Sequence, residues 1–221
     1  EEGFKARYNS ELANELGNLV SRTTSMINKY RGGTVPAPPP GYSDPPEYSA
    51  ACPRSPLAVE ATTTSATVRG QLEDMDLSGA LESIWVFVRR LNRYVEEQAP
   101  WKLAKEAAAA GDTVPGAGVA GATAGADGAA ITDGAAITNA AATLDATLWE
   151  LAEGLRLLSV LLHPFMPQTA AAIREWLGLG AVAGAATPGV ATPSWSEAVW
   201  GLLPAGTVVG MGAPLFPRIE D

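Results

Sequence analysis

Large apolar side chains recur with a helical period in the segment 77–98. Their spacing of 4, 3, 4, 3 and 4 residues places them on one side of a helix: Leu77, Leu81, Ile84, Val88, Leu91 and Val95. A seam of this kind is typical of helices that pack side by side in a bundle. Asp76 is a candidate N-cap, because its carboxylate can accept a hydrogen bond from a first-turn N–H. Pro100 ends the pattern, and a short helix is expected over residues 101–106.

Two further segments predict strong helices by the same criterion. Residues 4–30 carry an apolar stripe, and Gly32 and Gly33 should end that helix. Residues 144–163 carry a leucine seam that Pro164 should end. The apolar positions of the two segments are Leu12, Leu16, Leu19, Val20, Met26 and Ile27 in the first, and Leu144, Leu148, Leu151, Leu155 and Leu158 in the second.

The remaining patterns are weaker. Residues 57–75 predict a helix that three consecutive threonines disfavour, residues 167–177 start at a proline that suits a first helical turn, and residues 195–202 predict a last short helix. The proline-rich residues 37–56 and the C-terminal tail should be irregular. Because no segment shows the alternation of a strand, we predict an all-α bundle of about five helices with low-complexity loop insertions.

The segment 107–142 has a low-complexity composition, with 16 alanines and 7 glycines and without Lys, Arg or Glu. The hexamer at 127–132 is repeated at 133–138. These side chains are too small to bury a core, so a flexible insertion is expected at 107–142, and a second Ala/Gly-rich loop at 181–192. Residues 1–221 are therefore interpreted as one domain with two insertions.

Charge and composition limit the classes of function. The net charge is −9, which disfavours binding by general phosphate neutralisation, but residues 84–105 hold five cations against two carboxylates. A single cysteine excludes an internal disulfide. Since neither a signal peptide nor an apolar run of about 18 residues is present, we expect a cytoplasmic protein without a membrane span. The chain opens without an initiator methionine, so we expect a fragment.

No catalytic or metal centre is predicted. The chain has one histidine, His163, in an apolar helix end where packing or a helix-dipole contact is the expected role. His163 and Cys52 alone cannot close a metal site. No phosphate-binding loop has the required spacing.

Three residues are candidates for contact with RNA. Asn18 and Arg22 lie one helical turn apart on the flank of the apolar stripe, where an amide and a planar guanidinium can reach base edges. Trp101 opens a helix after Pro100 and can present its ring to an unstacked base. Each of them also has a purely structural interpretation. Asn18 and Arg22 could lie on a solvated helix face, and Trp101 could pack in the core. Nearby cations are candidates for phosphate contacts: Lys29, Arg89, Arg93, Lys102 and Lys105.

Ordered motifs then resemble one family. The chain is similar to the C-terminal anticodon-binding domain of methionyl-tRNA synthetases, which are class I aminoacyl-tRNA synthetases. The motifs are RYNSELANELGNLVSR at 7–22, MINKY at 26–30, NRYVEEQAPWKLAK at 92–105, LRLLSVLLHPFMP at 155–167 and PLFPRI at 214–219. The two Ala/Gly-rich insertions depart from the family, as does the absence of a catalytic half with its His-x-Gly-His and Lys-Met-Ser-Lys-Ser signatures.

The resemblance implies roles for the candidates. In the family, an Asn and an Arg four apart on the first helix and the Trp of Ala-Pro-Trp contact the CAU anticodon, which matches Asn18, Arg22 and Trp101. It implies tRNA for methionine and the protein's own catalytic domain as partners, without DNA. It implies ATP and Mg as cofactors of the complete ligase, and zinc in the catalytic half of some members, with no cofactor in this segment. The segment alone should be inactive.

Three other interpretations remain open. The chain could be a stand-alone tRNA- or protein-binding module that never had a catalytic half. It could belong to a synthetase for another aliphatic amino acid, which the Ala-Pro-Trp motif disfavours, or be a plain helical scaffold.

Overall fold

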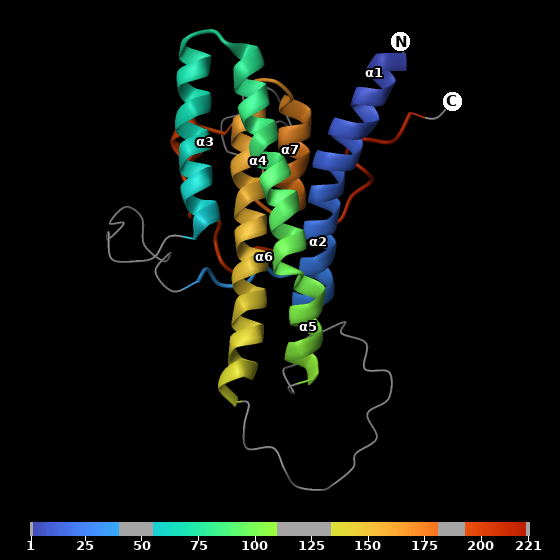
Figure 1. Ribbon diagram of the computed structural model, residues 1–221, viewed down its shortest axis with the longest axis vertical. Coiled ribbons are helices and arrows are strands. Elements are labelled where there is room, and N and C mark those ends of the chain that lie inside the picture. The colour runs from blue at the N-terminus through green and yellow to red at the C-terminus, as the bar shows by residue number, and fades with distance from the viewer. Residues whose placement is uncertain (1, 40–54, 110–133, 181–192, 220–221) are drawn as a thin grey trace, which may run out of the picture.

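The computed structural model describes residues 2–39, 55–109, 134–180 and 193–219, and nearly all of its regular structure is helical (Figure 1). Over these residues the prediction of an all-α bundle is confirmed, and the one β-bridge joins Thr34 to Val208. The elements are α1 (Glu2–Arg7), η1 (Tyr8–Gly17), α2 (Asn18–Arg31), α3 (Pro56–Glu73), α4 (Leu77–Gln98), α5 (Pro100–Ala109), α6 (Gly134–Leu162), α7 (Pro167–Trp176) and η2 (Trp195–Glu197). In this described part, no helix is both long and apolar enough to cross a membrane.

Helix α4 has the predicted bounds and the predicted cap. The Asp76 carboxylate accepts a hydrogen bond from the Gly79 N–H at 2.9 Å. The seam is buried from Ile84 to Val95, whereas Leu77 at the helix start is half exposed. At the other end Ala99 takes a left-handed φ of 44°, and Pro100 begins α5 at once. This left-handed residue separates the two helices, and α5 continues onward from the end of α4 (Figure 1).

Helix α6 forms the centre of the bundle. Every residue from 147 to 162 is buried, because α2, α3, α4, α5 and α7 all pack against this helix (Figure 1). It also begins earlier than predicted, at Gly134, and α5 extends to Ala109, so the expected insertion was wrong for residues 107–109 and 134–142. Alanine has the highest helix propensity, which favours a helix over this alanine-rich stretch. The rest of the predicted insertion, 110–133, lies outside the described residues, as does the 181–192 loop.

The weaker helices are confirmed in part. Helix α3 tolerates its threonines because their hydroxyls donate to carbonyls four residues earlier, as Thr62 does to Ala58 at 2.8 Å. Helix α7 begins at Pro167 as predicted. The helix predicted over 195–202 is wrong beyond the single turn of η2. The backbone N–H groups of residues 201–203 instead donate to the buried Glu153 carboxylate, at 2.6 to 3.2 Å.

The helix predicted over residues 4–30 is confirmed as one continuous rod of the first three elements, but the π-helical form of its middle part was not predicted. Residues Tyr8–Gly17 are π-helical, and Asn18 is the first residue after them. The irregular tail packs along this stretch: the Asn9 amide exchanges two hydrogen bonds with the Ile219 backbone, and Arg218 donates to Asn14 at 2.7 Å. Gly32, with φ 60°, ends the rod where predicted.

Candidate nucleic-acid interface

Arg22 and Trp101 lie together in the structure, although they are far apart in the sequence. The guanidinium carbon of Arg22 is 5.9 Å from the centroid of the Trp101 ring, within the range of a cation–π contact. Arg22 lies in the N-terminal half of α2, and Trp101 is the second residue of α5, which begins directly after the left-handed Ala99. Packing therefore joins two of the three predicted RNA contacts.

The Trp101 ring is accessible. Trp101 is 39% exposed, whereas Pro100 before it and Ala104 one turn later are buried. The start of α5 is thus held in the bundle while the ring remains at the surface. This exposure argues against the alternative interpretation, in which Trp101 packs in the core.

Asn18 opens α2, one turn before Arg22, and is exposed. Within the described part of the chain, its side-chain amide makes no hydrogen bond. Its donors and acceptor are therefore available to a ligand. The π-helix that ends at Gly17 sets the angular position of Asn18 on the rod.

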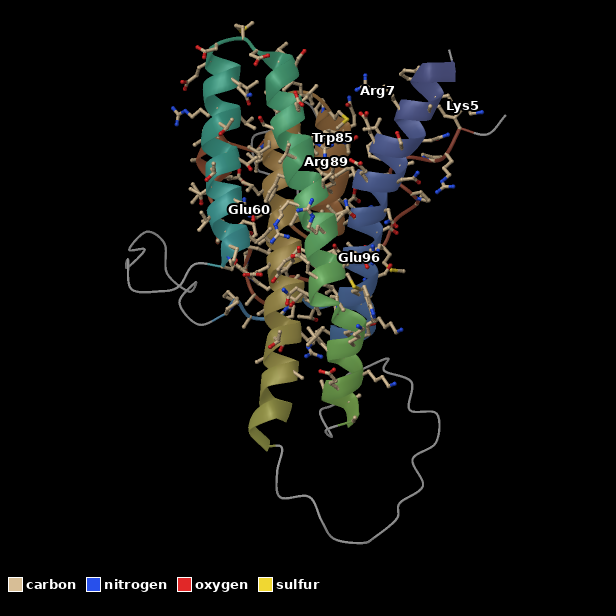
Figure 2. The ribbon with its side chains drawn as sticks, in the orientation of Figure 1. Lys5, Arg7, Glu60, Trp85, Arg89 and Glu96 are labelled. Carbon is tan, nitrogen blue, oxygen red and sulfur yellow. The ribbon has the colours of Figure 1, made fainter. Side chains whose placement is uncertain are left out.

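Glu96 is a residue of this surface that sequence reasoning did not select. Its Oε1 lies 2.8 Å from Nη1 of Arg22, and Figure 2 labels it on the part of α4 that faces α2. The Arg22 and Glu96 side chains are 33% and 59% exposed, so water screens the ion pair. The pair orients the guanidinium beside the Trp101 ring. In the sequence, Glu96 could have been selected only from its acidic side chain and its position shortly before the Ala-Pro-Trp motif.

The five predicted phosphate contacts are all exposed, but they differ in their neighbours. Lys29 has its Nζ 5.4 Å from the Tyr30 ring centroid, and Arg89 has its Nη1 3.9 Å from the Glu15 carboxylate. Among the described residues, Arg93, Lys102 and Lys105 have no ion-pair partner. These three cations, near or on α5, are therefore the ones most available to an anionic ligand.

Arg90 shows how the bundle uses a cation for its own cohesion. It pairs with Glu60 of α3 at 3.0 Å and with Glu97 at 3.1 Å, and it lies over the Tyr94 ring. Burial disfavours its charge, but the hydrogen bonds and charges of Glu60 and Glu97 outweigh burial and raise the pKa of Arg90. Arg90 is thus committed to the contact between α3 and α4.

His163 is half-buried just beyond the end of α6, and its Nδ1 has no hydrogen-bond partner among the described residues. No group of three metal-ligating side chains occurs in the described ranges. Cys52 lies outside them.

Comparison with known proteins identifies the family to which this chain is related. No protein-family model matches the chain. A methionine–tRNA ligase of Deinococcus radiodurans is 36% identical over 97% of the chain, and one of Streptomyces coelicolor is 34% identical over the whole chain. The chain is homologous to the C-terminal part of methionine–tRNA ligases. A crystal structure of methionyl-tRNA synthetase from Mycobacterium tuberculosis, in its free state, shares the fold with a TM-score of 0.66 and 25% identity over the whole chain.

The chain spans 24% of the D. radiodurans ligase, 34% of the S. coelicolor ligase and 35% of the M. tuberculosis structure. The resemblance to methionyl-tRNA synthetases is thereby confirmed, and none of these relatives is a synthetase for another amino acid. The homology does not test the roles of Asn18, Arg22 and Trp101, which stay predictions.

Proposed function

We propose that the chain recognises the CAU anticodon of the tRNA for methionine, as the C-terminal part of a methionine–tRNA ligase. The observation that carries the proposal is the exposed Trp101 ring beside the Arg22 guanidinium, in a chain homologous to that part of the ligases. An aromatic face, a planar cation and an amide at neighbouring positions are the groups that single-stranded RNA loops require.

Each group has a distinct task in this proposal. The Trp101 ring stacks on an unpaired anticodon base, a contact worth about 1–3 kcal/mol. Arg22 and Asn18 hydrogen-bond to base edges. Arg93, Lys102 and Lys105 attract the phosphates around the loop, while Lys29 extends the cationic rim. Arg89 lies farther along α4, near the Glu15 carboxylate, and is not part of this rim. The net charge of −9 does not oppose this, because only a few nucleotides are contacted.

Catalysis belongs to the part of the ligase outside this chain. There, ATP and Mg, and zinc in some members, would serve the attachment of methionine to the tRNA. This chain has one histidine and its sequence contains no phosphate-binding loop, so its part in the ligase is to bind and orient the tRNA and not to activate methionine. A cytoplasmic setting and the protein's own catalytic domain as partner complete the proposal. The comparisons give no support to a stand-alone module.

The test is binding of the chain to an RNA hairpin with a CAU loop, and to the same hairpin with the first loop base changed. We expect tighter binding of the CAU loop, and a loss of roughly 5- to 150-fold in Trp101→Ala. Trp101→Phe should retain part of the affinity, because a smaller ring still stacks. Phe4→Ala is the matched control, since Phe4 is an exposed aromatic residue at the opposite end of the first rod. Equal binding of the two loops, or an equal loss in Phe4→Ala, would overturn the proposal.

A further inference from the structure

Asn92 lies on the side of α4 that packs against the first rod (Figure 1). Its side-chain amide is partly buried and donates a hydrogen bond to the Glu15 backbone carbonyl at 3.2 Å. The same nitrogen donates to the Val88 carbonyl of its own helix, also at 3.2 Å. Because a side-chain amide nitrogen carries two hydrogens, it can make both bonds at once, and it joins α4 to the rod at one carbonyl.

The Glu15 carbonyl lies where the rod changes its winding. Residues Tyr8–Gly17 are π-helical, and α2 begins at Asn18. The backbone N–H of Asn18 donates to the carbonyls of Ala13 and Glu15. One oxygen atom, that of the Glu15 carbonyl, therefore accepts both the Asn92 amide and the Asn18 N–H. Two hydrogen bonds through this atom connect the Asn92 side chain to the backbone of Asn18.

The winding of the rod determines the direction in which Asn18 points. A π-helix makes hydrogen bonds five residues apart and an α-helix four residues apart, so a π-helical stretch rotates the residues that follow it about the helix axis. A side chain that inserts into the ladder of backbone hydrogen bonds is one cause of such irregular winding. Asn92 inserts in this way, since its amide occupies a carbonyl in the last turn of the π-helix.

We infer that Asn92 is a positioning residue for anticodon recognition, and that it acts through the Glu15 carbonyl on Asn18. The inference rests on the proposed function, in which Asn18 hydrogen-bonds to a base edge. Asn92 itself does not contact the RNA, because its amide is committed to two carbonyls. One helical turn further along α4, Glu96 pairs with Arg22 at 2.8 Å. Helix α4 thus places both polar groups of the proposed interface, one through a backbone carbonyl and one through an ion pair.

The Glu15 side chain does not replace this contact. Its Oε2 is buried and has no hydrogen-bond partner among the described residues. The nearest cation, Nη1 of Arg89, lies 3.9 Å from it, too far for a hydrogen bond (Figure 2 labels Arg89 on α4). The directed bond between α4 and this turn of the rod therefore comes from Asn92.

Replacing Asn92 tests the inference on the CAU hairpin and on the hairpin with the first loop base changed. Asn92→Leu keeps the size of the side chain but removes the amide, so packing is retained while the donor is lost. We expect the affinity for the CAU hairpin to fall by roughly 2- to 10-fold, the cost of one lost hydrogen bond, and discrimination between the loops to weaken.

Asn28→Ala is the matched control. Asn28 is also a partly buried asparagine, but its amide donates within α2, to the Thr24 carbonyl at 2.9 Å. Its replacement should leave both the affinity and the discrimination unchanged. The melting temperature of each variant is measured in parallel, and binding is compared at matched folded concentration.

A double-mutant cycle shows whether Asn92 acts through Asn18. If Asn92 acts by placing the Asn18 amide, Asn92→Leu should cause no further loss of affinity in a chain that already carries Asn18→Ala. Additive losses would show that Asn92 acts elsewhere, and would refute the inference.

Amide hydrogen exchange of the free chain tests the same link without RNA. Exchange in residues 13–22 should quicken by roughly 2- to 10-fold in Asn92→Leu, whereas exchange in α3 should stay unchanged. Unchanged exchange at 13–22, or unchanged discrimination in Asn92→Leu, would overturn the inference and leave the anticodon proposal standing. A wild-type chain that does not distinguish the two loops would instead remove the anticodon proposal, and the positioning role with it.

Discussion

Arg22 of α2 and Glu96 of α4 form an ion pair of 2.8 Å beside the exposed ring of Trp101. The pair holds the guanidinium at the surface where an RNA loop is proposed to bind. The same carboxylate repels phosphate, so Glu96 both positions Arg22 and opposes an anionic ligand. The first prediction separates these two effects.

Replacing Glu96 with Gln should strengthen binding of the CAU hairpin. The substitution removes a negative charge and frees Arg22 for the RNA, while an amide of the same shape stays in place. Because an exposed ion pair is worth about 0.2–1 kcal/mol, the gain should be at most roughly fivefold at low salt and smaller at high salt. Titration of the hairpin at two ionic strengths measures this. Weaker binding in Glu96→Gln would mean that holding Arg22 in place matters more than repulsion.

Replacing Arg22 with Ala should weaken the CAU hairpin by roughly 5- to 150-fold, the cost of about 1–3 kcal/mol for a lost bidentate base contact. Arg22→Lys keeps the charge but loses the planar fork, so it should restore little if Arg22 reads a base. Arg69→Ala is the matched control, because Arg69 is an exposed, ion-paired arginine on α3.

The loop with a changed first base identifies what Arg22 contacts. Contact with that base predicts that Arg22→Ala loses discrimination between the loops as well as affinity. Contact with phosphate alone predicts an equal loss for both loops and a shallower salt dependence. An unchanged affinity for both loops would exclude Arg22 from the interface.

Replacing Glu153 with Gln should destabilise the fold without altering the RNA-binding surface directly. Glu153 is fully buried, pairs with Arg156 at 2.7 Å and accepts the backbone N–H groups of residues 201–203. Removing one charge of a buried pair costs about 3–5 kcal/mol, because the other charge is left uncompensated. Urea unfolding followed by circular dichroism measures the change. A loss below about 1 kcal/mol would show that water replaces the carboxylate.

Two deletions of different length in the Ala/Gly-rich segment should lower the melting temperature by different amounts. Replacing residues 110–133 with a short Gly/Ser linker should leave the melting temperature within about 5 °C, because loop length changes stability only slowly. Extending the deletion through Ala140 should cost more, since it removes the first turns of α6, which packs against α5. Thermal melts of the two deletions test this, and equal melting temperatures would mean that those turns contribute nothing.

Much of the fold follows from interactions between residues close in sequence. The seam of α4, its Asp76 cap and the glycine at the end of the first rod are determined by helical periodicity and local hydrogen bonds, so they could be predicted. The candidates Asn18, Arg22 and Trp101 could also be named, from their types, their local spacing and the family motifs around them. Their adjacency could not be derived from periodicity, which determines only which face of a helix a residue occupies.

Tertiary packing decided the rest. The cation–π contact between Arg22 and Trp101 exists because the start of α5 lies near α2 in the folded bundle, and Glu96 joins them only in that arrangement. The helix predicted after Trp195 stops early because a buried carboxylate from α6 competes for its N–H groups. In each case the stabilising contact comes from a residue distant in sequence, so a pattern of neighbouring residues cannot predict it.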